Sequence, residues 1–281
     1  MQLVLSLYPG ADLLGRAFHH AGFAVVLGPD LLWDSRIEEF HVPPNRFNGI
    51  IGGPPCTHYS DANRNRNPAE GDRLVGHFLR IVDEGMPEWF VLENVRNIPD
   101  VRIRPYHIQR LDMLDLDFGG RQTRLRHIQF GSLDGSIIRP PRTQPPRPVT
   151  PVPTVTTADS GPGDRHCRRL AKQGFGPLPL RSLTPTARRR VIGNGVPFGI
   201  GYALALAVSQ RSSVTPNDCI CLCGRQVTPP AKHATAACRK RMERRRHNHT
   251  RTITFNGLCA IAGNWAVPSG DPADTTRHIP S

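Results

Sequence analysis

The sequence predicts an α/β fold, in which helices cover both faces of a largely parallel sheet. The first observation is a set of short apolar runs with the character of buried strands, at residues 3–8, 24–27, 49–51 and 89–95. The second is that helix-like segments, residues 11–22 and 69–85, lie between these runs. Strands that alternate with helices in this way are typical of parallel sheets.

The segment at residues 69–85 has the clearest helical pattern, and Gly85 can end it. Its apolar residues recur at helical spacing, at Leu74, Phe78, Ile81 and Val82. Further along, residues 117–131 predict a turn followed by a strand with alternating side chains. Residues 183–208 predict a turn at Gly193–Pro197 that leads into an Ala-rich helix.

The composition favours a nucleic-acid partner. The 281 residues are enough for one sizeable domain and a small appendage. The formal charge of +13 indicates a polyanionic partner, and a merely basic surface is the open alternative. Seven irregularly spaced cysteines do not resemble a secreted disulfide framework, and the first 18 residues lack the basic start of a signal peptide. No apolar stretch approaches the roughly 20 residues of a membrane span, so we expect a cytoplasmic protein without a membrane partner.

Chemically active residues follow several of the predicted strands. Ligands of parallel sheets bind beyond the carboxyl ends of the strands, and this rim would carry residues 8–12, Asp30, Cys56 and Glu93. Cys56 ends the stiff stretch GGPPC, whereas structural cysteines usually lie within apolar periodicity. Together with the arginines of QTRLR (residues 122–126), a thiol and a carboxylate suit attack on a poorly reactive aromatic ring.

A pyrimidine is such a ring, because its C5 is too weak a nucleophile to accept a methyl group unaided. A thiolate that adds to C6 turns C5 into an enamine carbon, provided that the ring is polarised at N3. A carboxyl group beside N3 can share a proton there and accept from the exocyclic amine. An arginine can hold the O2 edge by charge-assisted hydrogen bonds.

Four motifs, in this order, resemble those of the DNA cytosine-5 methyltransferase family. GGPPCTHYS is similar to the nucleophile loop, ENV (93–95) to the glutamate motif, QTRLR to the Q-x-R-x-R motif and GNGVP (193–197) to the final cofactor motif. The resemblance covers about residues 1 to 208. It implies a Rossmann-like, S-adenosylmethionine-dependent methyltransferase sheet with a short target-recognition region.

The resemblance also implies a role for each catalytic residue. Cys56 would attack C6, Glu93 would engage N3 and the amine, and Arg126 would hold O2. Arg124 would support the loop or a phosphate, and Asn94 would brace the glutamate turn. Other interpretations stay open at this point: an ordinary loop thiol, a solvated strand-end carboxylate and a solvated basic face. The target base would have to leave the duplex stack to reach these groups.

The resemblance places the methyl donor, S-adenosylmethionine, against a set of rim residues: Tyr8, Gly10, Ala11, Asp30, Asp34, Pro54, Asn194, Gly195 and Val196. Asp30 would accept from the ribose hydroxyls, although an acid after Gly-Pro is also a common turn residue. Asp34 is our choice for the third acidic motif, with Arg36 at the rival register. Asp12 departs from the family, which usually has glycine there; its carboxylate would either repel the donor's carboxylate or bond its amino group.

The last part of the chain, residues 210–281, is basic, because 11 Lys+Arg against 4 Asp+Glu give a net charge of +7. Its Cys221, Cys223 and Cys238 resemble small zinc-binding modules with C-x-C-G followed by C-R-x-R, and His233 could supply a fourth ligand. Free thiols in a basic tail are the alternative. The sequence therefore leaves zinc open.

Together these observations predict a catalytic core from residues 1–131 and 183–209, a short Pro-rich target-recognition segment at 132–182 and a basic module at 210–281. The expected activity is methyl transfer to C5 of a flipped cytosine in double-stranded DNA through a covalent bond from Cys56 to C6. The alternatives are an RNA cytosine-5 methyltransferase and a catalytically silent DNA-binding relative. We expect a monomer in a bacterial or phage-infected cell, with a cognate restriction endonuclease as a candidate partner.

Overall fold

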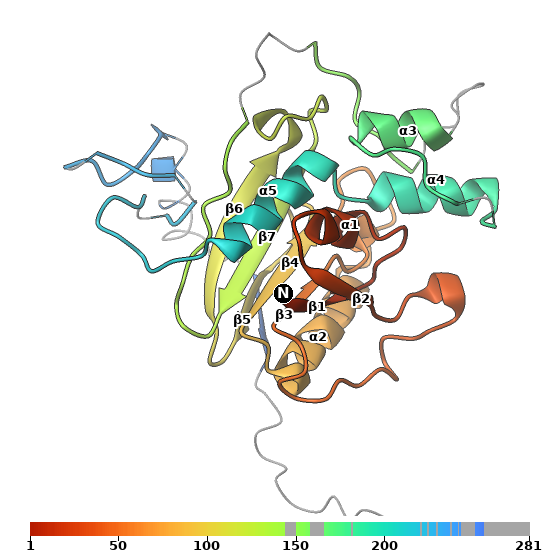
Figure 1. Ribbon diagram of the computed structural model, residues 1–281, viewed down its shortest axis with the longest axis horizontal. Helices are drawn as coiled ribbons and strands as arrows, with labels where there is room; N and C mark the ends of the chain where they lie inside the picture. The colour runs from red at the N-terminus through yellow and green to blue at the C-terminus, as the bar shows by residue number, and fades with distance from the viewer. Residues whose placement is uncertain are drawn as a thin grey trace, which may run out of the picture.

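A six-stranded sheet forms the centre of the protein in the computed structural model (Figure 1). Its strands lie in the order β2 (Ala24–Leu27), β1 (Leu3–Leu7), β3 (Gly49–Gly52), β4 (Trp89–Asn94), β7 (Leu125–Ser132) and β6 (His107–Leu114). The structure describes residues 1–143, 150–157, 166–180, 182–219, 221–223, 225–228, 230–236, 238–240, 242 and 251–255.

The four strands β1 to β4 run parallel, as the alternation of strands and helices predicts. The strands β7 and β6 continue the sheet in antiparallel pairing, β7 against β4 and β6 against β7. The prediction of a largely parallel α/β sheet is therefore confirmed. Its antiparallel edge gives β7 a register in which Glu93 lies opposite Ile128, and this register positions the arginines that precede it.

Helices cover both faces of the sheet (Figure 1). On one face α1 (Leu13–His20) and α5 (Phe198–Ser209) pack together over the sheet, and Phe18, Trp89 and Ile200 are fully buried there. On the other face α2 (Pro68–Gly85) buries Phe78 against Phe90 of β4. Apolar burial on two faces is the main driving force for such a fold.

The ends of α2 follow local capping chemistry. The Asn67 side chain accepts a hydrogen bond from the Glu70 backbone N–H. Pro68 occupies the first turn, where a backbone N–H would have no partner within the helix. The helix includes Gly85, but Met86 takes the left-handed conformation that ends it, at φ +44°. Gly85 is instead required for packing, because an added Cβ would lie 3.0 Å from Cγ1 of Val42.

Several elements were not predicted from the sequence, and β6 and α4 are two of them. Strand β6 alternates buried residues with polar ones such as Arg110 and Asp112, and these interrupt the apolar run. Helix α4 (Pro185–Asn194) precedes the predicted turn; it begins at Thr184, whose hydroxyl caps the Ala187 N–H. Its three consecutive arginines hide the buried face formed by Val191 and Ile192.

The region after residue 210 also returns to the core. Strand β8 (Thr252–Phe255) pairs in parallel with β5 (Asp100–Ile103) to form a second, two-stranded sheet. Arg251 contacts Asp72 of α2 and accepts, through its carbonyl, a hydrogen bond from the Asp100 N–H. Much of the basic run at 238–249 lies outside the described residues.

A third apolar cluster closes the rim at the carboxyl ends of the strands. Helices α3 (His166–Lys172) and α4 pack there with Ala11, Val155 and Phe175. Parts of the predicted target-recognition segment therefore belong to the core, although residues 144–149 and 158–165 lie outside the described part. Among the described helices, no single one has the length and apolar character of a membrane span; α4 and α5, bent by 46°, reach it only as a pair.

Candidate active site

Cys56 lies at the start of a short 3₁₀ helix, η2 (Cys56–His58), directly after strand β3 and the Gly-Gly-Pro-Pro turn. The two glycines are required by close approach. An added Cβ on Gly52 would lie 2.8 Å from the Leu7 carbonyl oxygen, and one on Gly53 would lie 2.7 Å from Oε2 of Glu93. The stiff loop thus lets the carboxylate of Glu93 rest against the backbone that carries the thiol.

Glu93 and Arg126 form a buried ion pair beside this loop. Arg126 Nε lies 2.7 Å from Glu93 Oε1, and the two residues are only 7% and 6% exposed. They come from β7 and β4, whose antiparallel register brings them together. Burial raises the pKa of Glu93, and the opposing charges of Arg126 and Arg124 lower it.

The thiol of Cys56 responds to the same charges. Burial raises its pKa, Arg126 lowers it and Glu93 raises it again. The resting thiol is therefore protonated near neutral pH, and a base must accept its proton when it adds to a ring. The structure brings Cys56, Glu93 and Arg126 into one electrostatic neighbourhood.

Asn94 joins the nucleophile loop to the turn after Glu93. Its Nδ2 donates to the Pro54 carbonyl oxygen at 2.9 Å, and its Oδ1 accepts from the Val95 N–H at 2.8 Å. Asn94 is 1% exposed, so both bonds are shielded from water. These are the contacts that bracing the glutamate turn requires.

Arg124 points into the protein. Its guanidinium donates to the carbonyl oxygens of Val155 at 2.5 Å, Gly193 at 2.6 Å and Gly195 at 2.9 Å. Burial lowers its pKa to about 9. Of the two roles expected for Arg124, these contacts match support of the loop; at 3% exposure the side chain is not available to a phosphate.

Gln122, the first residue of QTRLR, is likewise buried and bonded to backbone groups. It is fully buried, its Nε2 donates to the Lys172 carbonyl oxygen and its Oε1 accepts from the Val155 N–H. The sequence motif contains it, but only its burial shows that it ties three segments together. Gln122 and Arg124 therefore hold the residues around 155, 172 and 193–195 at the rim.

The expected cofactor residues gather around the ends of β1 and β2. Asp30 accepts from the Gly10 N–H at 2.8 Å and from the Leu32 N–H at 2.9 Å, so it caps η1 (Leu31–Trp33) and fixes the first loop. Asp34 is exposed at the end of η1, and Arg36 is exposed as well. Asp30 is thus a turn residue, as one interpretation had it, and it also lies at the rim beside the first loop.

Three other residues expected to bind the cofactor make contacts within the protein itself. Tyr8 donates its hydroxyl hydrogen to the Leu74 carbonyl oxygen of α2 at 2.8 Å. Ala11 lies in the third apolar cluster, and Pro54 is buried under the bond from Asn94.

The GNGVP motif has a structural reason for its glycines. An added Cβ on Gly195 would lie 2.3 Å from Cδ1 of Leu13, and one on Gly193 would lie 2.6 Å from the Thr157 nitrogen. Asn194 is half-buried and Val196 is 4% exposed. The motif therefore joins α4 and α5 to the first loop with no room for larger side chains.

Asp12 caps the start of α1 in the left-handed conformation, at φ +52°. Its Oδ1 accepts from the Ser6 hydroxyl at 2.8 Å, a partner that the sequence did not suggest. Burial raises its pKa to about 6, and the Ser6 hydrogen bond lowers it. A carboxylate thus occupies the positive end of the helix, which favours anions.

The cysteine group near the C-terminus differs from the prediction in one member. The sulfur atoms of four cysteines lie within 4.8 Å of one another, and the four are Cys219, Cys221, Cys223 and Cys238. His233 is not part of this group, so Cys219 takes the place predicted for it. The C-x-C-x-C pattern contained Cys219, but spacing alone could not show that all three cysteines turn to one point.

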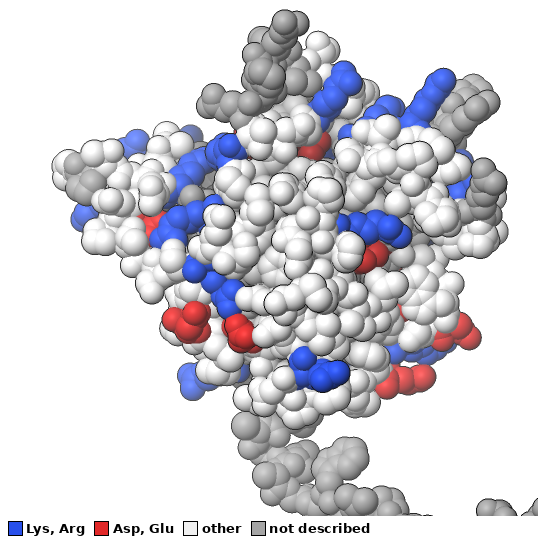
Figure 2. Space-filling model, in the orientation of Figure 1, with Lys and Arg blue, Asp and Glu red and all other residues white. Residues whose placement is uncertain are grey.

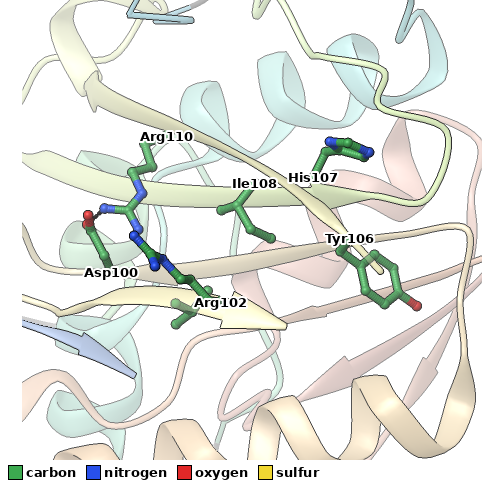
Figure 3. A pocket seen from close by; sticks show the side chains of 7 residues that line it. Asp100, Arg102, Tyr106, His107, Ile108 and Arg110 are labelled. Carbon is green, nitrogen blue, oxygen red and sulfur yellow. Dashed lines mark ion pairs between the residues drawn. The ribbon is translucent and has the colours of Figure 1, made fainter. Parts of the chain in front are cut away.

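A cavity of about 410 Å³ lies apart from these residues, between β5 and β6. Figure 3 shows Arg102 and Arg110 beside Asp100 on its wall, with Tyr106 and His107 at its other end. Its lining does not include Cys56, Glu93 or Arg126. The chemistry of the rim, not this cavity, defines the candidate site.

Comparison with known proteins relates part of this site to a known family. Residues 34–144 match the family model described as C-5 cytosine-specific DNA methylase, and the match includes Cys56, Glu93, Arg124 and Arg126. This range, called the methylase domain below, is similar to C-5 cytosine-specific DNA methylases over 111 of the 281 residues. The methylase domain thus contains the buried ion pair and the nucleophile loop, whereas residues 8–30 and 193–196 lie outside the matched range.

Curated relatives of the methylase domain are type II methyltransferases. M.AgeI of Thalassovita gelatinovora is 26% identical over 176 residues, 49% of this chain and 41% of that protein. M.FnuDI of Fusobacterium nucleatum is 30% identical over 115 residues, 34% of this chain and 33% of that protein. The chain therefore spans less than half the length of these relatives.

Solved structures show the same fold around the methylase domain. The Entamoeba histolytica methyltransferase EhMeth aligns with a TM-score of 0.54 at 11% identity, over 75% of this chain and 99% of that one. The S. pombe Dnmt2 methyltransferase aligns with a TM-score of 0.51 at 10% identity, over the same shares. The predicted methyltransferase fold is confirmed.

Proposed function

We propose that the protein transfers a methyl group from S-adenosylmethionine to C5 of cytosine in double-stranded DNA. The observation that carries the proposal is the buried pair of Glu93 and Arg126 against the loop of Cys56, all within the methylase domain. A buried carboxylate with a raised pKa beside a thiol is what ring activation at N3 and C6 requires. The type II methyltransferase relatives support DNA as the substrate.

In this proposal the protein's groups act in a fixed order. The target cytosine turns out of the duplex, Cys56 gives up its proton and its sulfur bonds to C6. Glu93 shares its proton with N3 as the electron pair of the sulfur forms the C6–S bond, and the displaced π electrons of the C5–C6 double bond make C5 an enamine carbon. C5 then bonds to the methyl carbon as the methyl–sulfur bond of the donor breaks, and S-adenosylhomocysteine is released. C5 next loses its proton to a base, the C5–C6 double bond forms again, and the C6–S bond breaks to return the thiolate of Cys56. Arg126 holds Glu93 in place, and its guanidinium would also donate hydrogen bonds to O2 of the base.

S-adenosylmethionine would supply an electrophilic methyl group, and the residues of the first loop fit it. Gly10 has φ +56°, and a Cβ added there would meet nothing nearer than 3.9 Å, so the loop leaves room for a ligand. Each carboxylate oxygen of Asp30 accepts one backbone bond and keeps capacity for a ribose hydroxyl. Asp12 fits the ammonium group of the donor rather than its carboxylate.

The basic surface supports a nucleic-acid substrate. The chain carries a formal charge of +13, and basic side chains predominate along the upper part of the face in Figure 2. Phosphate contacts of this kind offset the cost of base flipping, which is a few kcal/mol. A cognate endonuclease, a monomeric state and a cytoplasmic location stay predictions that follow from this function.

The test is labelled methyl transfer from S-adenosylmethionine to duplex DNA and to tRNA in parallel. Transfer to duplex DNA, with covalent trapping on a 5-fluorocytosine duplex, is the expected result. Transfer to tRNA alone would replace DNA by RNA as the substrate. Absence of transfer together with absence of donor binding at equilibrium would favour the silent relative, in which Asp12 spoils the cofactor loop.

A further inference from the structure

The four-cysteine group described above lies next to β6, an edge strand of the sheet. The sulfur atoms of Cys219 and Cys221 lie 3.4 Å apart, and those of Cys223 and Cys238 lie 3.6 Å apart. A disulfide needs a separation of about 2.05 Å, so neither pair is one. Four thiolates at about 2.3 Å from a tetrahedral zinc ion are about 3.8 Å from one another, which agrees with the observed spacing.

Hydrogen-bond donors surround these sulfur atoms. The Ala234 N–H donates to Sγ of Cys219 at 3.3 Å, and the Thr235 hydroxyl donates to Sγ of Cys238 at 3.2 Å. Arg225 Nη1 lies 3.9 Å from the same Cys238 sulfur. Donors aimed at sulfur stabilise a thiolate, and partners of this kind orient the ligands of a metal.

Burial adds a second reason for a cation. Cys219, Cys221 and Cys238 are 0%, 1% and 2% exposed, and Val227 and Met242 pack against them. Several buried thiolates repel one another unless a positive ion neutralises them. Soft sulfur ligands in a closed tetrahedral set select zinc, and a closed set leaves no position for catalysis.

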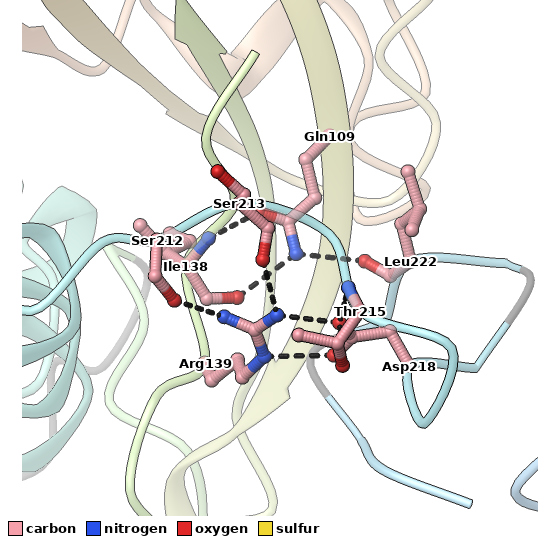
Figure 4. A network of polar contacts seen from close by, with 8 residues as sticks. All are labelled: Gln109, Ile138, Arg139, Ser212, Ser213, Thr215, Asp218 and Leu222. Atoms are coloured by element: carbon pink, nitrogen blue, oxygen red, sulfur yellow. Dashed lines mark hydrogen bonds and ion pairs between the residues drawn. The ribbon is translucent and has the colours of Figure 1, made fainter. Parts of the chain in front are cut away.

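The cysteine group is also tied to the sheet (Figure 4). Leu222, between two of the ligands, has a left-handed backbone at φ +51°, and its carbonyl oxygen accepts from Gln109 Nε2 of β6 at 2.8 Å. Gln109 is 3% exposed and exchanges two further hydrogen bonds with the backbone of Ile138. A metal that fixes the loop around Leu222 therefore fixes this contact as well.

A second link lies directly before the first ligand. Both oxygens of Asp218 pair with the guanidinium of Arg139, at 2.7 Å to Nε and 2.5 Å to Nη2. Arg139 also donates to the Ser212 hydroxyl and the Ser213 carbonyl oxygen. The cysteine loop is thus held on both sides of Cys219 by residues that belong to or follow the sheet.

We propose that Cys219, Cys221, Cys223 and Cys238 bind one structural zinc ion, which fastens residues 212–238 onto β6 through Gln109 and Arg139. The proposal stands on residues outside the methyl-transfer site and does not depend on the proposed function. The metal closes a small loop that has too little apolar surface to fold by itself.

Metal content of the full chain tests the ligand set. We expect about one zinc per chain after dialysis, and cobalt in its place should give thiolate-to-metal charge-transfer absorption and tetrahedral d–d bands. Each Cys→Ser change at the four ligands should abolish binding. The matched controls are Cys167→Ser, an exposed cysteine outside the group, and His233→Ala; both should keep the metal.

A second measurement uses the wild-type chain, so it does not depend on whether the Cys→Ser variants fold. Zinc added to the metal-free wild-type chain should protect four thiols from a thiol reagent, and a chelator should expose them again. Amide exchange should become faster in β6 and residues 137–139 when zinc is removed, and should stay unchanged in β1. Absence of zinc and cobalt binding, or loss of the metal in His233→Ala but not in Cys219→Ser, would overturn the ligand set; unchanged exchange in β6 would overturn the fastening role.

Discussion

The guanidinium of Arg126 lies 2.7 Å from the carboxylate of Glu93, and both side chains are less than one-tenth exposed. The two residues are 33 positions apart in the chain and meet because β7 pairs in antiparallel register with β4. A buried pair of this kind is costly to break, since the remaining charge has no water to solvate it. The pair therefore connects the stability of the methylase domain to the chemistry proposed for it.

Replacement of Cys56 by serine should abolish methyl transfer. A hydroxyl is a far weaker nucleophile than a thiolate, so we expect a loss of at least about a thousandfold. Labelled methyl transfer to duplex DNA measures it. Cys167→Ser, which changes an exposed thiol, should keep full activity; equal activity of Cys56→Ser and wild type would exclude the covalent scheme.

Removal of one partner of the buried ion pair should destabilise the fold. Arg126→Ala removes the ion-pair partner of the buried Glu93, and we expect the free energy of unfolding to fall by about 3–5 kcal/mol. Denaturant unfolding measures the change. Arg66→Ala is the control, because its pair with Asp61 is exposed and should contribute less than about 1 kcal/mol. Equal effects of the two changes would show that the Glu93 pair is not desolvated as the structure has it.

Arg124 should act on donor binding rather than on the chemical step. Its three carbonyl acceptors include Gly193 and Gly195 of the expected cofactor motif, so Arg124→Lys should let this motif shift. We expect donor affinity to fall by about tenfold, the equivalent of one lost charged hydrogen bond. Equilibrium binding of S-adenosylmethionine, compared with kcat at saturating donor, separates the two effects. A fall in kcat with unchanged donor affinity would contradict this positioning role.

The buried carboxyl of Asp12 should make stability depend on pH. Burial raises its pKa from 3.8 to about 6, so between these values the folded state holds a proton that the unfolded state has released. The free energy of unfolding gained from this group therefore falls as pH rises from about 4 to about 6. Asp12→Asn should lose this fall and be more stable than wild type at pH 7, as measured by thermal unfolding across pH.

The control for this titration is Asp61→Asn, since Asp61 is largely exposed. That change should leave in place the fall attributed to Asp12. Profiles of wild type and Asp12→Asn that run parallel between pH 4 and 6 would show that Asp12 is ionised in the folded protein at low pH. In that case its carboxylate would be stabilised by Ser6 and the start of α1 more than burial disfavours it.

Much of the sheet could be predicted because its signals are local. The strands β1, β2, β3 and β4 are recognised by their apolar runs, and α2 by the helical spacing of its apolar residues. Both signals can be read directly from the sequence. Strand β6 could not be found in this way, because its polar residue Gln109 is buried by contacts with Ile138 and Leu222, far along the chain. Helix α4 was not predicted because its three consecutive arginines interrupt the apolar pattern, and its buried residues Val191 and Ile192 pack in the cluster that includes Leu170 of α3.

The sequence by itself determined which chemical groups the rim carries: a thiol after Pro-Pro, a carboxylate at a strand end and arginines two residues apart. Only the tertiary structure decided how they divide the work, turning Arg126 to Glu93 and Arg124 inward to three carbonyl oxygens. It likewise placed Cys219, not His233, with the other cysteines. Residue type and strand position are local properties, whereas the direction of a buried side chain depends on which distant segment supplies its hydrogen-bond partner.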